Sequence, residues 1–407
     1  MLEIVAIITS IIIVEIFVRK IVIFTNKNFQ WLIIQKDETP KLSEEGLTKF
    51  FEHGFDPELG WVRKPMTVHE ENGKEGKTKW SINDYSARNN PTWNEKESEI
   101  SCYGDSFTFS RQVNDDQTWE HFLSNKIQTN VKNFGVGNYG IDQTILRLKR
   151  EFPNNRTKIV IIGIVPDTIS RILSVWKHYY EYGNTFGFKP RFVLKNGKLE
   201  LIKNFIDEKG KFTSYVQYLP EIKKYDYFYG KKFKKEKIIF PYTISVLKNF
   251  KRNISIIFWI LKIYLSKRPS EKTKWKPMSI IMKINLEWRL KLYKNEEVKK
   301  LFEEIILNFV EYAKEQNFKP VLVFLPQKDD LGFIKKEYHF YNEFVNKIRK
   351  NETLTVIDIQ NYLSKEENID EFFSDNNEYG GHYSKIGNKK IAYYLEEIFR
   401  KSEILKD

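Results

Sequence analysis

Short apolar runs alternate with amphipathic stretches along most of this 407-residue chain. The apolar runs predict strands at residues 100–103, 130–134, 158–162, 320–325 and 354–358. Helical spacing of apolar residues predicts helices at 118–127, 142–151, 297–316, 336–349 and 384–400. Strands that alternate with helices form a parallel sheet covered on both faces. The pattern therefore predicts an α/β domain with three layers, α/β/α, around a five-stranded parallel sheet.

The predicted sheet is interrupted by a large insertion, and it is preceded by a long lead-in. We expect a first half at residues 99–169, an insertion or cap at 170–293 and a second half at 294–407. The insertion is rich in aromatic and basic residues. It follows the third strand and so lies near the carboxyl edge of the sheet, where ligands bind in such folds. Residues 1–25 and 26–98 are expected to form an anchor and a linker with the lead-in.

The N-terminal segment is strongly apolar over residues 4–24, apart from Glu15, Arg19 and Lys20. About 20 apolar residues can cross a bilayer as a helix. Because no small-residue cleavage site follows, the pattern predicts an uncleaved, single-pass transmembrane helix. The positive charges after the span favour a cytoplasmic body, but the orientation stays open.

The net charge of +13 is concentrated in one segment of the insertion. Residues 231–294 hold 18 Lys and Arg against three Glu, which leaves the rest of the chain near neutrality. A local charge of this kind does not indicate a nucleic-acid partner. Basic residues flank an apolar run at 254–265, which suits an anionic membrane surface. Residues 248–268 are therefore either a second membrane contact or a cap helix packed on the core.

A candidate nucleophile and a candidate base stand at opposite ends of the predicted domain. Ser106 follows the first strand in Gly104-Asp105-Ser106, and a serine on a turn between strand and helix is well placed for nucleophilic attack. By itself this tripeptide is an ordinary turn sequence. His382 lies in a glycine-rich loop before the last amphipathic helix, where it could serve as a general base.

Four blocks, read together, resemble those of SGNH (GDSL-type) hydrolases and acyltransferases. The blocks are Gly104-Asp-Ser-Phe-Thr-Phe109, the lead-in Ser81-Ile-Asn-Asp-Tyr-Ser-Ala-Arg88, Asn133-Phe-Gly-Val-Gly-Asn-Tyr-Gly-Ile-Asp-Gln143, and Gly380-Gly-His-Tyr-Ser-Lys-Ile-Gly-Asn388. The resemblance implies a flavodoxin-like α/β/α fold, no metal, no cofactor, and acyl-enzyme chemistry at an ester. Ser106 is then the nucleophile and His382 the base. The backbone N–H groups of Ser106 and of Asn138, or of Gly137 after a one-residue shift, would bind the oxyanion.

Two positions depart from the family pattern. The third block normally supplies an Asn side chain to the oxyanion, but Pro166 stands there and has no N–H to donate. Asn184, Arg171 and His178 are candidate replacements.

The acid of the triad is expected three residues before the histidine, where this chain has Tyr379. Asp375 is the first candidate for this acid and Glu378 the second. A Ser–His pair assisted by a backbone carbonyl is the remaining possibility.

These features predict a membrane-anchored serine esterase that removes O-acyl groups, above all O-acetyl groups, from a cell-surface carbohydrate or lipid. A polysaccharide O-acetyltransferase with the same Ser–His pair is the first alternative, and a non-catalytic glycan- or membrane-binding module is the second. The family resemblance favours an extracytoplasmic catalytic domain. The sequence has no phosphate-binding loop, zinc-ligand spacing or dinucleotide fingerprint.

Overall fold

A computed structural model describes residues 2–29, 32–38, 42–181, 183–375, 379, 381–402 and 404–405. All five predicted strands are confirmed, as β5 (Ser98–Gly104), β6 (Asn130–Asn133), β7 (Ile159–Ile164), β10 (Lys319–Phe324) and β11 (Thr355–Asp358). They form a parallel sheet in the order β11-β10-β7-β5-β6. In chain order this is 2-1-3-4-5, the flavodoxin-like arrangement.

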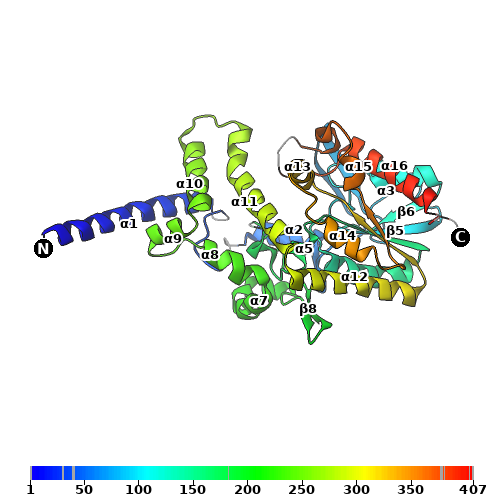
Figure 1. The fold of residues 1–407 in the computed structure, drawn as a ribbon, viewed down its shortest axis with the longest axis horizontal. Helices are drawn as coiled ribbons and strands as arrows, with labels where there is room; N and C mark the ends of the chain where they lie inside the picture. Colours follow the sequence, from blue (N-terminus) through cyan, green and yellow to red (C-terminus); the bar gives the residue numbers. More distant parts are fainter. Residues whose placement is uncertain are drawn as a thin grey trace. The chain divides into compact units, whose positions relative to one another are not determined.

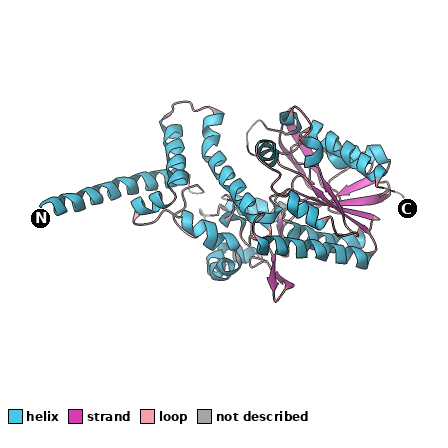
Figure 2. Cartoon of the chain, in the orientation of Figure 1, coloured by secondary structure: helices cyan, strands magenta, loops and turns pink. Residues whose placement is uncertain are grey.

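Helices cover both faces of the sheet because its strands are apolar on both sides. The central strand β7 is buried at every position. On one face, Ile100 and Cys102 pack in one cluster with residues of α3 (Trp119–Ile127) and α16 (Lys385–Lys401). The helix α12 (Glu296–Gln316) lies on the opposite face, with α4 (Ile141–Glu151) beside it (Figures 1 and 2). The predicted three-layer architecture is confirmed.

One predicted helix is wrong in its bounds. Residues 336–349 do not form a single helix but the end of α13 (Lys328–Lys336) and then α14 (Asn342–Ile348). The break lets Tyr341 stack on Phe324 of β10 with ring centroids 5.6 Å apart, while its hydroxyl contacts Asp358 at 3.2 Å. Packing on the sheet therefore overrides the helical periodicity.

The stretch expected to be a linker and lead-in, residues 26–98, also contains structure. The helix α2 (Glu44–His53) forms there, with Leu47, Phe50 and Phe51 on its apolar side. Three antiparallel pairs follow in the chain: β1 (Phe55–Asp56) with β2 (Gly60–Trp61), β3 (Val68–Gly73) with β4 (Gly76–Ser81), and β8 (Arg191–Lys195) with β9 (Lys198–Ile202).

The chain divides into two compact units. The first unit comprises residues 1–48, 174–188 and 208–287, and the second comprises 49–173, 189–207 and 288–407. The second unit contains the sheet and all four sequence blocks. The first contains α1 (Leu2–Asn28), α9 (Tyr242–Lys248), α10 (Phe250–Leu265) and most of α11 (Glu271–Leu292).

The N-terminal segment is a continuous helix, α1, whose apolar side chains are largely exposed. Glu15, on α1, accepts hydrogen bonds from the backbone N–H groups of Tyr242 and Thr243 in α9. In the described part of the chain, none of the helices combines the length and apolar character needed to cross a membrane. The expected transmembrane helix is therefore not supported.

Candidate active site

The loop that carries Ser106 is held against the neighbouring strand by two glycines. Gly104 at the end of β5 lies opposite Gly163 of β7. A Cβ atom on Gly104 would stand 2.1 Å from the Gly163 carbonyl oxygen, which only a glycine avoids. The Thr108 hydroxyl then donates to this carbonyl at 2.9 Å. The first block therefore needs its glycine for close approach between strands.

The buried carboxylate of Asp105 joins the Ser106 loop to the third block. It accepts from the backbone N–H of Phe107 at 2.8 Å and of Val165 at 3.1 Å, and from Arg171 Nη1 at 3.1 Å. Burial raises the pKa of Asp105, although the Arg171 charge and these hydrogen bonds oppose it. Asp105 thus positions the loops around Ser106.

The second block lies beside the nucleophile. The Asn133 amide donates to the Thr108 carbonyl at 2.8 Å, and the Val136 N–H donates to the Gly104 carbonyl at 2.9 Å. A Cβ atom on Gly137 would be 3.9 Å from Ser106 Cβ. Asn138 has φ +68°, in the left-handed region that Asn tolerates better than most residues. This explains how Asn can stand where the family has Gly.

The third block offers no side-chain donor at Pro166, whose carbonyl instead accepts from the Tyr293 hydroxyl at 2.9 Å. Arg171 is buried and bound to Asp105, Asp167 and the Tyr139 carbonyl. Asn184 belongs to the first unit, where its amide donates to the Glu181 carboxylate at 3.1 Å. His178 also belongs to the first unit.

His382 is held by an amide oxygen that the sequence did not single out. Its Nδ1 lies 2.9 Å from Gln112 Oε1, and its backbone N–H donates to the same oxygen at 3.0 Å. Gln112 Nε2 donates to the Asn72 carbonyl at 3.3 Å. The His382 ring also packs against the Phe107 ring, with centroids 4.9 Å apart.

These contacts fix the tautomer of the imidazole. A backbone N–H can only donate, so the Gln112 atom facing His382 is the oxygen. An oxygen acceptor requires that Nδ1 carry the proton, which leaves Nε2 with a free lone pair. Burial, followed by the charges of Arg111 and Arg171, lowers the pKa of His382 well below its usual value. The ring is therefore neutral near pH 7 and can accept a proton at Nε2.

The loop that presents Gln112 is shaped by the buried Arg88, the last residue of the lead-in block. Its guanidinium donates to the carbonyls of Phe109, Ser110 and Val113 at 2.5 to 2.7 Å and pairs with Asp115 at 2.8 Å. Arg88 thereby binds the carbonyls on both sides of Gln112.

The backbone of this loop is strained at two positions. Ser110 and Gln112 have φ of +56° and +67°, a conformation that surrounding contacts must enforce. Glu71 of β3 supplies two of these contacts, because it accepts from the Gln112 N–H at 2.7 Å and from Arg111 Nε at 2.9 Å.

The last block is tied to the first through Asn388. Its Oδ1 accepts from the Ser110 hydroxyl at 2.9 Å and from the Trp119 N–H at 3.2 Å. A Cβ atom on Gly387 would come within 2.3 Å of the Phe372 carbonyl oxygen. Gly387 therefore allows α16 to pack closely on Phe372, while Asn388 joins α16 to the segment that follows the first block.

The candidates for the triad acid remain predictions. Asp375 packs against Gly381, and its backbone carbonyl accepts from Lys328 at 3.3 Å. Glu378 lies outside the described residues. Nδ1 of His382 is hydrogen-bonded to Gln112. Within the described part of the chain, the Ser106 hydroxyl makes no hydrogen bond, and so none joins it to the His382 ring.

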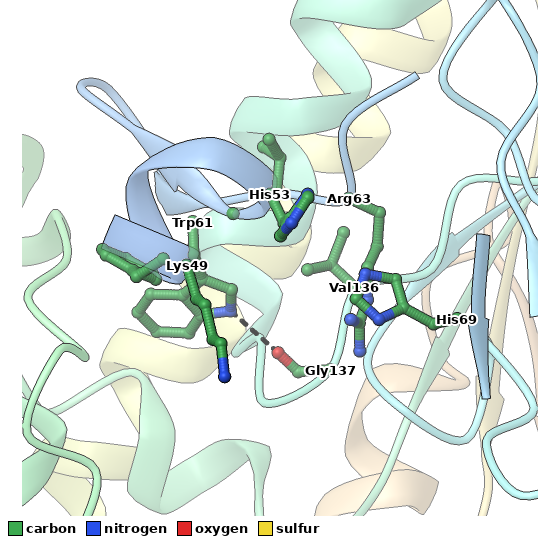
Figure 3. Close-up of a pocket in the computed structure, with 10 residues that line it drawn as sticks. Lys49, His53, Trp61, Arg63, His69, Val136 and Gly137 are labelled. Atoms are coloured by element: carbon green, nitrogen blue, oxygen red, sulfur yellow. Dashed lines mark hydrogen bonds between the residues drawn. The ribbon is translucent and has the colours of Figure 1, made fainter. Parts of the chain in front are cut away.

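A pocket of about 530 Å³ opens beside this site (Figure 3). Its wall includes Trp61, Arg63, Val136 and Gly137, and the Trp61 indole donates to the Gly137 carbonyl at 2.8 Å. Gly137 is thus shared by the pocket and the surroundings of Ser106. In the described residues, no cluster of His, Cys, Asp and Glu is arranged to hold a metal ion.

Known proteins were compared with the chain. No family model and no curated protein sequence matches it. Among solved structures, the chain is similar to a lipolytic protein of the G-D-S-L family from Desulfitobacterium hafniense DCB-2 (13% identity, 74% of this chain and 99% of that chain, TM-score 0.34). It is also similar to the acetyl xylan esterase AlAXEase (10%, 74% and 98%, TM-score 0.36). A third similar structure is an acetyl xylan esterase from the rumen bacterium Butyrivibrio proteoclasticus (8%, 78% and 66%, TM-score 0.30).

The chain resembles SGNH hydrolases. What carries the resemblance is the order of the four blocks and their convergence on the loops around Ser106. The sequence does not single out Gln112, Glu71 or Arg63, because each belongs to a segment without a recognisable motif. In the sequence, the Gln112 loop is indicated only indirectly, by Arg88, the last residue of the lead-in block.

Proposed function

We propose that this protein is a serine esterase that cleaves O-acyl esters of a carbohydrate or lipid through an acyl-enzyme on Ser106. The observation that carries the proposal is the hydrogen bond from His382 Nδ1–H to Gln112 Oε1. This bond leaves Nε2 as the basic atom, in the same loop cluster as a serine on a tight turn after a strand. A nucleophile, a neutral base and a residue that orients the base are the parts that nucleophilic catalysis at an ester requires.

The proposed reaction proceeds in two steps. Nε2 of His382 removes the proton from Ser106 Oγ as the oxygen attacks the ester carbonyl. The tetrahedral intermediate collapses when the imidazolium returns this proton to the leaving alcohol, and Ser106 keeps the acyl group. Water then attacks the acyl-enzyme with His382 again as base, which releases the carboxylic acid and restores Ser106.

The oxyanion is proposed to be bound by backbone N–H groups alone. The N–H groups of Ser106 and of Asn138 or Gly137 are the candidates, supported by the short separation between Gly137 and Ser106. Pro166 removes the side-chain donor of the third block, and one missing donor typically costs about 10²–10³ in rate. We therefore expect slower turnover than in an enzyme with a complete oxyanion hole.

The proposal is tested by labelling the full-length protein with a fluorophosphonate probe. We expect labelling of the wild type and of the exposed-site control Ser402→Ala, but none of Ser106→Ala or His382→Ala. A folded wild type that does not react would overturn the esterase and leave the non-catalytic binding module. The lack of a side-chain donor at Pro166 is the observation that favours that alternative.

An O-acetyltransferase would form the same acyl-enzyme and differ only in the acceptor. The two are separated by measuring acetate release from an acetyl ester with and without a polysaccharide acceptor. Acetate released at the same rate in both cases supports the esterase, whereas product formed only with the polysaccharide supports the transferase.

We further propose that the first unit attaches the protein to an anionic membrane surface. In α10, Ile256, Ile257 and Ile260 are buried, whereas Phe250, Ile254 and Phe258 are exposed at four-residue spacing. Exposed basic residues accompany this apolar stripe, namely Lys248, Lys251, Lys262, Lys267 and Arg268. An exposed apolar stripe with basic neighbours suits a helix that lies in the membrane interface.

A further inference from the structure

The pocket beside Ser106, here called the Arg63 pocket, is lined by several groups that can carry positive charge. Lys49, His53, Arg63 and His69 all contribute to its wall (Figure 3). Among the described residues, no carboxylate lines it. Arg63 and the two histidines line the same space, and a bound anion would interact favourably with positive charge on them.

Arg63 is the most constrained of these groups. Its guanidinium stacks on the rings of Trp80 and Phe109, at 4.5 and 5.0 Å from their centroids. Its Nε is buried and has no hydrogen-bond partner among the described residues. The stacking holds the guanidinium plane in place and leaves its edge for a ligand.

In the described part of the chain, Arg63 forms no ion pair with a carboxylate. Glu71 lies in its neighbourhood, but this carboxylate already accepts from Arg111 and from the Gln112 N–H. Burial lowers the pKa of Arg63 to about 10, helped by the charge of Arg111 and opposed by Glu71. Arg63 therefore remains charged near pH 7, while its charge is poorly compensated by the protein.

The two histidines of the pocket pack against each other, and His69 also packs against Trp80. The His69 ring stacks on Trp80 at 4.8 Å and meets the His53 ring edge-on at 5.6 Å. Burial, then the charge of Arg63, then His53 lowers the pKa of His69. His53 Nε2 lies 3.7 Å from a carboxylate oxygen of Glu52, in a solvent-exposed pair.

The pocket is coupled to the reacting serine through Gly137. A Cβ atom on Gly137 would be 3.7 Å from Arg63 Nη2 and 3.9 Å from Ser106 Cβ. Gly137 is also held by the Trp61 indole, which presents an aromatic surface to the pocket. An anionic group bound at Arg63 is thus within one sugar ring of an ester at Ser106.

Resting on the esterase function above, we propose that the Arg63 pocket binds a carboxylate or phosphate of the substrate, so that the substrate is an O-acylated acidic carbohydrate. The guanidinium edge of Arg63 forms charge-assisted hydrogen bonds to the anionic oxygens. The aromatic Trp61 and a volume of about 530 Å³ suit a sugar residue that bears this group.

The experiment measures binding without catalysis. Full-length Ser106→Ala protein is titrated with glucuronate, glucose 6-phosphate and glucose, and the change in tryptophan fluorescence is followed. We expect saturable binding of one or both anions and at least tenfold weaker binding of glucose. The two anionic ligands distinguish a carboxylate from a phosphate site.

Substitution of Arg63 gives the second measurement. In the Ser106→Ala background, Arg63→Gln should weaken anion binding about 10- to 100-fold, the range for hydrogen bonds to charged groups. Arg63→Lys should recover only part of it, and the exposed-site control Arg156→Gln should have no effect. Equal binding of glucose and the anions, or unchanged anion binding by Arg63→Gln, would overturn the proposal.

This outcome is independent of the proposed reaction. If the wild type is not labelled by fluorophosphonate but the anions bind through Arg63, the esterase fails while the anion site stands. If labelling succeeds and the anions do not bind, the esterase stands and its substrate is neutral.

Discussion

Replacement of Gln112 tests whether an amide oxygen does the work of the triad acid. In Gln112→Ala, His382 Nδ1–H loses its acceptor at 2.9 Å. This bond becomes charge-assisted when the ring is protonated in the transition state, and such bonds contribute about 1.5–3 kcal/mol. We therefore expect kcat/KM for a p-nitrophenyl ester to fall roughly 10- to 150-fold. The backbone contact from Gln112 to Glu71 is retained, so the loop should stay folded.

The variant Gln112→Glu gives a pH readout that a purely structural role would not produce. His382 acts as a base only when it is unprotonated, so the rate falls as pH drops through its pKa. In the wild type this pKa is lowered well below 6.5, so the rate should be level between pH 6 and 8. A carboxylate beside the ring raises the pKa by roughly 1–3 units. The acid limb should therefore move to higher pH.

The matched control is Gln128→Glu, which adds the same charge at an exposed position. Gln128 also has a left-handed backbone, with φ +57°. Its pH profile should equal that of the wild type. If Gln112→Ala keeps the wild-type kcat/KM and pH profile while Asp375→Asn loses activity, the reasoning is refuted and Asp375 is the triad acid.

Two further predictions concern the fold and the membrane. Gly104→Ala forces a Cβ atom to within 2.1 Å of the Gly163 carbonyl oxygen, and should lower the free energy of unfolding, measured by urea titration, by about 3 kcal/mol. Gly332→Ala, at an open helical position, should leave the free energy of unfolding unchanged. Equal stability of the two variants would contradict the close-packing argument. Phe250→Ser with Phe258→Ser should reduce binding to vesicles of anionic phospholipid at least tenfold, because two exposed apolar rings are lost. Ile386→Ser, which removes an exposed apolar side chain of α16, is the control, and equal binding by all three proteins would exclude α10 as the contact.

The sequence by itself determined the sheet and the candidate pair Ser106 and His382. A buried strand such as β7 is apolar at nearly every position, and this local property is legible without tertiary structure. The glycines of the blocks could also be recognised from the sequence, but the reason why glycine is required there could not. Gly104 is needed because Gly163, far along the chain, comes against it.

Only the tertiary structure decided which groups assist the pair. Gln112 reaches His382 because Arg88 and Glu71 hold its loop in an unfavourable backbone conformation, which brings Oε1 to the imidazole. The position of the Arg63 guanidinium likewise depends on rings from β4 and from the Ser106 loop. Neither arrangement has a sequence period or a motif, since contacts between distant segments leave no local pattern. The same cause divided the predicted helix at 336–349, where packing on β10 prevailed over periodicity.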